Sequence, residues 1–155
     1  MYQTILVPLD GSARAERILP HVEELAQRFR ARVVLLRVAA VEEPVHVPLE
    51  LKSTIDAQVE RNRIAPYDPY VEARSYLESK CARLQGQNIQ ADMRVQEGPV
   101  VQTIIDVAKS ENADLIAMSS HGRTGLERVF YGSVTAGVLH RADRPVLVIR
   151  ARDGD

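Results

Sequence analysis

Short runs of branched apolar residues alternate with segments of helical periodicity along this 155-residue chain. The apolar runs are Thr4–Leu9, Arg32–Ala39, Gln90–Gln96, Asp114–Met118 and Pro145–Arg150. Strands that alternate with helices are joined by right-handed crossovers and form one parallel sheet. Because Val33–Leu36 and Val146–Ile149 are apolar in succession, helices are expected on both faces of that sheet. We therefore predict an α/β fold, a doubly wound five-stranded parallel sheet in the order 3-2-1-4-5, as one domain over residues 1–155.

The segments between these runs carry apolar stripes at spacings of three and four residues. Ser12–Arg30 shows the longest stripe and is predicted to be one helix. The other predicted helices are Val71–Leu84, Val100–Ser110 and Ser133–His140, and Ser133 is predicted to cap the last of them. Asp10-Gly11-Ser12 supplies turn and N-cap residues before the first helix, so Asp10 is expected either to cap it, to face a ligand, or to do both.

The connection Val41–Pro69 has no clear pattern. It contains four prolines (Pro44, Pro48, Pro66 and Pro69) and a charged middle, in which we expect a short helix near Leu51–Arg61. A structureless connection of this length is uncommon unless it is a lid, a partner surface or a disordered segment. The sequence leaves these three interpretations open, and the connection is predicted to be mobile.

Composition excludes several classes of partner and location. A formal net charge of −1 gives no indication of nucleic acid or an anionic membrane as a partner. No stretch approaches the roughly 18 apolar residues of a membrane helix, and Met1–Thr4 lacks the basic region of a signal peptide. Cys81, the single cysteine, cannot form an internal disulfide, which fits a reducing compartment. We expect a cytoplasmic protein.

Residues 118–133, "MSSHGRTGLERVFYGS", follow an apolar run and precede a predicted helix. This stretch holds three glycines, two arginines and five hydroxyl side chains within sixteen positions. Backbone N–H groups of glycine-rich turns and helix N-termini bind anions. Ligands of doubly wound sheets bind at the carboxyl ends of the strands, where this loop is expected. Neither a Walker pattern nor G-x-G-x-x-G is present, so the loop is predicted to hold phosphate in another way.

Three segments carry a resemblance to a known family: "ILVPLDGSARAERIL", "VVLLRV" and "ADLIAMSSHGRTGLERVFYGSVTAGVLHRADRPVLVIR". They are similar to the universal stress protein family, a nucleotide-binding α/β group, over nearly the whole chain. The resemblance implies a Rossmann-like, adenine-nucleotide alpha-hydrolase-like fold. Members that bind ATP carry G-x2-G-x9-G-[ST], and here that register is Ser119, Gly122, Gly132 and Ser133. Serine replaces the first glycine, and its Cβ limits how closely a ribose or phosphate can approach.

The resemblance also implies a set of binding residues for ATP, with Mg²⁺. Pro8 and Asp10 would lie beside the nucleotide, with Asp10 facing the ribose or a metal-bound phosphate, and the Val38 backbone would meet the adenine edge. The loop and the following helix would enclose ribose and phosphates through Met118, Ser119, Ser120, His121, Gly122, Arg123, Thr124, Gly125, Gly132, Ser133, Val134 and Thr135. No residue is assigned to catalysis or to a metal site of the protein itself.

Two other function classes share this fold. A phosphoacceptor receiver domain needs an aspartate after the third strand and a lysine before a late proline, where this chain has Gln96-Glu97 and Arg144. A slow nucleotide-hydrolysing or nucleotidyl-transferring enzyme stays open as the alternative to a nucleotide-dependent switch in a stress response.

The resemblance and the apolar last strand also predict a homodimer. In the switch interpretation, Val41–Pro69 is the segment expected to move when nucleotide binds, and a partner protein would respond to that movement.

Overall fold

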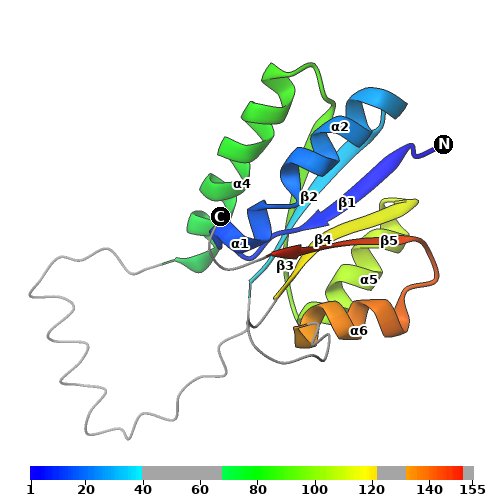
Figure 1. Ribbon diagram of the computed structural model, residues 1–155. Coiled ribbons are helices and arrows are strands. Elements are labelled where there is room, and N and C mark those ends of the chain that lie inside the picture. The colour runs from blue at the N-terminus through cyan, green and yellow to red at the C-terminus, as the bar shows by residue number, and fades with distance from the viewer. Residues whose placement is uncertain (40–67, 122–131, 152–155) are drawn as a thin grey trace, which may run out of the picture.

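The computed structural model describes residues 1–39, 68–121 and 132–151 and confirms the predicted parallel sheet (Figure 1). The strands are β1 (Thr4–Pro8), β2 (Arg32–Ala39), β3 (Ala91–Glu97), β4 (Leu115–His121) and β5 (Val146–Ala151). The helices within the described ranges are α1 (Ala13–Glu16), α2 (Leu19–Phe29), α4 (Pro69–Gly86), α5 (Val100–Ser110) and α6 (Ser133–Arg141). All four strand pairs are parallel, in the order β3-β2-β1-β4-β5. None of the described helices is both long and apolar enough to cross a membrane.

Helices cover both faces of the sheet (Figure 1), and a cluster of buried apolar side chains lies on each face. On β2, Val33 and Leu35 pack against α2 and α4, whereas Val34 and Leu36 pack toward α5 and α6. All four side chains are completely buried. Burial of one such side chain contributes about 1.5–3 kcal/mol. The strand is therefore held in place by apolar burial on both faces.

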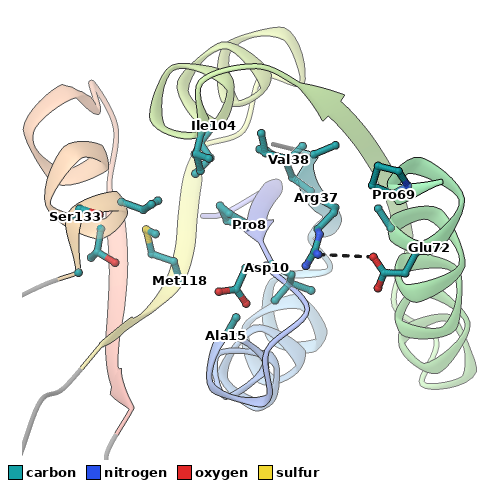
Figure 2. A pocket seen from close by; sticks show the side chains of 18 residues that line it. Pro8, Asp10, Ala15, Arg37, Val38, Pro69, Glu72, Ile104, Met118 and Ser133 are labelled. Carbon is teal, nitrogen blue, oxygen red and sulfur yellow. Dashed lines mark ion pairs between the residues drawn. The ribbon is translucent and has the colours of Figure 1, made fainter. Parts of the chain in front are cut away.

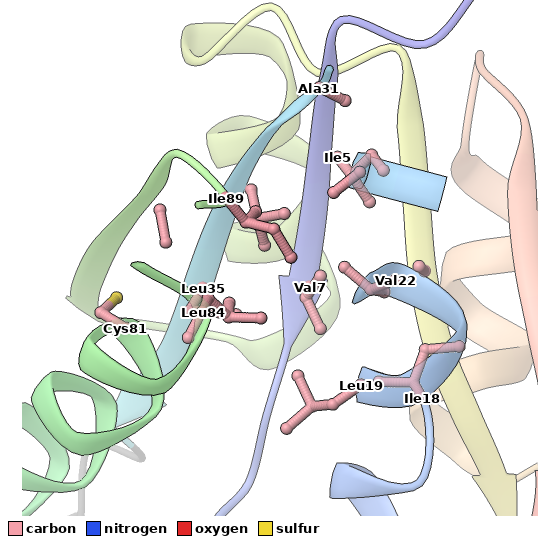
Figure 3. Close-up of a cluster of buried hydrophobic side chains, with 14 of the residues drawn as sticks. Ile5, Val7, Ile18, Leu19, Val22, Ala31, Leu35, Cys81, Leu84 and Ile89 are labelled. Atoms are coloured by element: carbon pink, nitrogen blue, oxygen red, sulfur yellow. The ribbon is translucent and has the colours of Figure 1, made fainter. Parts of the chain in front are cut away.

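The core under α2 and α4 includes the single cysteine (Figure 3). Burial, followed by the charge of Asp92, raises the pKa of the Cys81 thiol to about 11. A thiol with this pKa stays protonated near neutral pH and is a poor nucleophile. Cys81 therefore acts as a core side chain.

The ladder between β1 and β4 is short. These strands pair only at Ile5 with Leu115 and at Leu6 with Ile116, whereas β4 and β5 stay paired as far as His121. The N–H of Leu9 donates to Leu36 of β2 at 2.8 Å. Backbone groups of successive residues in a strand point to the two neighbouring strands in turn. Since Leu9 bonds to β2, the backbone of Pro8 faces β4, and proline has no N–H to donate there. The two strands therefore separate at their carboxyl ends.

The prediction of a single helix over Ser12–Arg30 is wrong. The chain forms α1 and α2 with a break at Arg17–Ile18, and Pro20 occupies the first turn of α2. Proline cannot donate to the carbonyl four residues earlier, and its ring clashes with that carbonyl. This local cost outweighs the apolar stripe, which continues across the break because both helices face the same core.

The other boundaries are close to the predicted ones, with one difference that bears on the site. Ser119, Ser120 and His121 were predicted in the loop, but they extend β4 because they pair with Ile149–Ala151 of β5. The expected helix near Leu51–Arg61 and the predicted mobility of the connection lie outside the described residues.

Candidate functional site

A pocket of about 520 Å³ lies at the carboxyl edge of the sheet, where β1 and β4 separate (Figure 2). Its lining comes from the carboxyl-end parts of β1, β2 and β4, from Ala15 of α1 and from the N-terminal parts of α4, α5 and α6. This volume is in the range of pockets that bind small molecules and cofactors. The crevice beside the point of strand-order reversal is also where ligands of doubly wound sheets bind.

One wall of the pocket is the turn that follows β1. The Asp10 Oδ1 atom accepts hydrogen bonds from the backbone N–H of Ser12 at 2.8 Å and from its hydroxyl at 2.6 Å. Ser12 in turn accepts from the N–H of Ala15 and is the N-cap of α1. The φ angle of Gly11 is +86°, a left-handed conformation that favours glycine. Ser12 is thus the cap, and Asp10 holds the turn that places the cap.

The Asp10 carboxylate stays charged at neutral pH. Burial raises its pKa, but the hydrogen bonds from Ser12 and the positive charge of Arg37 outweigh burial and leave the pKa below the ordinary value. Figure 2 shows this carboxylate between Met118 and Arg37 in the pocket view. The turn therefore presents a negative, hydrogen-bond-accepting group to the pocket.

The opposite wall is the N-terminus of α6. Ser133 was predicted to cap this helix, and that prediction is wrong because Gly132 is the N-cap and makes no side-chain capping bond. The first intrahelical bond is from Ala136 N–H to Gly132 O. The N–H groups of Ser133, Val134 and Thr135 therefore have no intrahelical acceptor, and the helix dipole adds positive potential there. This end of the pocket can bind an anion.

An apolar surface connects the two walls. Pro8, Val38, Ile104 and Met118 line it, and Met118 is only 5% exposed. Flat apolar ligands fit such surfaces, with a few polar groups fixing their orientation. The pocket as a whole joins an anion-binding end, an apolar middle and an acidic wall.

The structure brings eight of the expected site residues together in this pocket. They are Pro8, Asp10, Val38, Met118, Gly132, Ser133, Val134 and Thr135. Ser119 and Ser120 lie in β4 but do not line it, and the backbone of His121 pairs with Ala151. Gly122, Arg123, Thr124 and Gly125 lie outside the described residues.

Ser119, the residue at the first glycine position of the motif, lies on the α1 side of the sheet. Its hydroxyl donates to the carbonyl of Ala15 at 3.3 Å. Neighbouring residues of a strand point to opposite faces, so Met118 reaches the pocket while Ser119 does not. The extra Cβ therefore supports α1 and does not narrow the described part of the pocket.

Sequence reasoning missed part of the lining. Arg37 of β2 and Glu72 of α4 bring opposite charges to the pocket, with Arg37 Nη2 3.8 Å from Glu72 Oε2 (Figure 2). A charged residue directly after the apolar run Val33–Leu36 was the available signal. Glu72 gave none, because its place depends on how α4 packs against β2.

This chain matches a family model described as the universal stress protein family over residues 1–150. The chain belongs to the universal stress protein family. It is 31% identical over 152 residues to universal stress protein MJ0531 of Methanocaldococcus jannaschii, across 97% of this chain and 83% of that protein. These matches agree with the resemblance carried by the three segments named above.

Solved structures of the family share the fold. The structure of MJ0577, from the same archaeon, superimposes with a TM-score of 0.74 at 30% identity and covers 99% of both chains. A universal stress protein in complex with cAMP superimposes with a TM-score of 0.60 at 21% identity, covering 97% of this chain and 98% of that one. At that identity the second comparison shows the common fold.

The contact of Ser119 with α1 predicts a stability effect. Ser119→Gly should lower the free energy of unfolding by about 1–2 kcal/mol, because it removes a hydrogen bond and places glycine within a strand. Ser119→Ala removes only the bond and should cost about half as much. Urea unfolding followed by circular dichroism measures both values. Equal stability of all three proteins would show that the bond to Ala15 contributes nothing.

Proposed function

We propose that this protein binds ATP in the pocket and acts as a nucleotide-dependent regulatory protein in a stress response. The observation that carries the proposal is the pairing, across one pocket, of the α6 N-terminus with the acidic turn at Asp10. A nucleotide needs an anion-binding end, a polar region for its ribose and an apolar region for its base. The pocket offers all three of these regions.

The proposed arrangement assigns each part of ATP to one region. The N–H groups of Ser133–Thr135 would bind phosphate oxygens, and Gly132 would let them approach the backbone closely. Asp10 would accept hydrogen bonds from ribose hydroxyls, and the apolar surface beside Val38 would hold the base. The choice of adenine rests on the family, in which a protein of the same fold has been solved with cAMP.

Magnesium would enter this site with the nucleotide. Within residues 1–39, 68–121 and 132–151, no three His, Cys, Asp or Glu side chains gather as a metal site. Mg²⁺ is commonly held by phosphates and one or two carboxylates, and it neutralises phosphate charge when bound. Asp10, already charged, fits the role of the single carboxylate.

The charges in the pocket favour holding ATP over cleaving it. In the described part of the chain, the charged side chains that line the pocket are Asp10, Arg37 and Glu72. Phosphoryl transfer needs cations around the transferred group, and this set has more acids than bases. We therefore propose a switch read by a partner protein, with turnover well below the roughly 10 s⁻¹ of typical enzymes. Multiple turnovers per second would support the enzyme alternative.

ATP binding is tested by calorimetric titration of the purified protein and by chromatography of small molecules released on denaturation. Gly132→Val should abolish binding, because the valine side chain would occupy the space where phosphate approaches. The backbone at Gly132, with φ −53° and ψ 156°, is one that valine can adopt, so the fold should persist.

Gly86→Val is the matched control. A Cβ at Gly86 meets nothing within 4 Å, and the residue ends α4, outside the pocket lining. This variant should bind ATP like the wild type. The proposal fails if the wild type binds no ATP at millimolar concentration, and the phosphate assignment fails if Gly132→Val binds normally.

We also propose that two copies pair through β5. Val146–Ile149 are half-buried apolar residues, and among the described strands none covers the outer edge of β5. The N–H of Ile116 donates to Pro145 O, so the backbone of Val148 faces away from β4. Unpaired apolar edges bind other strands.

Light scattering at tens of micromolar should give a dimer for the wild type. Val148→Pro should give a monomer, because proline removes an outward N–H without removing a bond to β4. Val148→Thr keeps the N–H and should stay dimeric. A monomeric wild type would rule out this pairing.

A further inference from the structure

Arg37 places a guanidinium at the wall of the pocket, between the turn after β1 and helix α4 (Figure 2). It lies in β2 between Leu36 and Val38, and its side chain is 20% exposed. Val38 packs toward the opposite face of the sheet, with α5. The neighbouring residues Arg37 and Val38 therefore line two different sides of the same pocket.

The guanidinium lies directly under Gly11. A Cβ added to Gly11 would be 2.5 Å from Arg37 Nη1, so any larger residue would displace the guanidinium. Nη1 is buried and has no hydrogen-bond acceptor among the described residues. A buried donor without an acceptor costs roughly 1–3 kcal/mol. This unpartnered donor therefore lowers the stability that Arg37 can contribute to the fold.

Helix α4 holds the other side of Arg37. The ring centroid of Tyr76 is 5.8 Å from the guanidinium carbon, and Glu72 is the ion-pair partner at 3.8 Å. Tyr76 donates to Glu16 of α1 at 2.8 Å, and Lys80 pairs with the same carboxylate at 2.7 Å. Arg37 thus lies within a set of contacts that connects α4, α1 and the turn at Asp10.

We propose that Arg37 is a positioning residue of the nucleotide site, which holds the Asp10–Ser12 turn against α4 and supplies the positive charge that balances the Asp10 carboxylate. This inference rests on the proposed function, because it explains how Asp10 is kept ready for the ribose or for Mg²⁺. Glu72 and Tyr76 connect this turn, through Arg37, to α4.

The charges around Asp10 give the direction of the expected pH effect. Arg37 of β2 is the side chain whose positive charge lowers the Asp10 pKa, after burial and the Ser12 hydrogen bonds. Helices α1 and α4 contribute the acids Glu16 and Glu72 and the phenol of Tyr76, and Lys80 of α4 is paired with Glu16. Met118 and Ser119 of β4 and Ser133–Thr135 of α6 are uncharged. Removal of the Arg37 charge should therefore raise the pKa of Asp10.

The test compares wild type, Arg37→Met and Arg37→Lys. Titration of ¹³C-labelled aspartate by NMR should show the Asp10 midpoint at higher pH in Arg37→Met and close to the wild-type value in Arg37→Lys. ATP affinity at pH 7 should fall roughly tenfold in Arg37→Met, the equivalent of one hydrogen bond to a charged group. On acidification, the ATP affinity of Arg37→Met should begin to fall at a higher pH than that of the wild type, because its Asp10 is protonated at a higher pH.

Arg74→Met is the matched control, since it removes the same charge from an exposed position of α4, where Arg74 pairs with Glu78. It should change neither the titration nor the affinity. Circular dichroism checks the fold, and Arg37→Gln replaces Arg37→Met if the methionine variant does not fold. An unchanged Asp10 midpoint in folded Arg37→Met overturns the inference whether or not ATP binds. A wild type that binds no ATP refutes the proposed function, while the NMR titration still decides the role of Arg37.

Discussion

The short ladder between β1 and β4 is the constraint on which the rest of this structure depends. Pro8 offers no N–H to β4, and the two strands are paired only as far as Leu6 and Ile116. Beyond that point β1 continues along β2, while β4 continues along β5. The pocket lies where these two halves of the sheet part, and the acidic turn and the α6 N-terminus face it from opposite halves. A continuous ladder would close this space.

The two walls of the pocket are built differently: one presents backbone N–H groups and the other presents a carboxylate. The α6 wall uses backbone N–H groups, whose positions follow from helix geometry once Gly132 starts the helix. The β1 wall uses the Asp10 side chain, which needs Ser12, Gly11 and Arg37 to hold its place and its charge. The α6 wall therefore follows from the geometry of one helix, whereas the acidic wall depends on contacts that reach α4.

The sequence predicted most of the fold, because apolar periodicity reports burial directly. The bounds of β2 and α5 were right to the residue, since Val33–Leu36 of β2 and Ile104, Ile105, Val107 and Ala108 of α5 are buried. Ser12–Arg30 failed because one missing N–H at Pro20 outweighs an apolar stripe that both helices share. The structure brings Asp10, Val38 and Gly132–Thr135 to one pocket. We expected them there from the family resemblance and from the rule that ligands bind at the carboxyl ends of parallel strands. Arg37 and Glu72 were missed, since their contact depends on the packing of α4.

Hydrogen exchange with and without ATP tests the central claim most directly, because it reports which backbone groups the nucleotide covers. At saturating ATP, protection should rise in peptides that contain Leu9–Ser12 and Gly132–Ala136, which form the two walls. The turn at Arg30–Ala31, at the other end of the sheet, should exchange as before. Protection that is absent from both walls, or confined to other segments, would contradict the account.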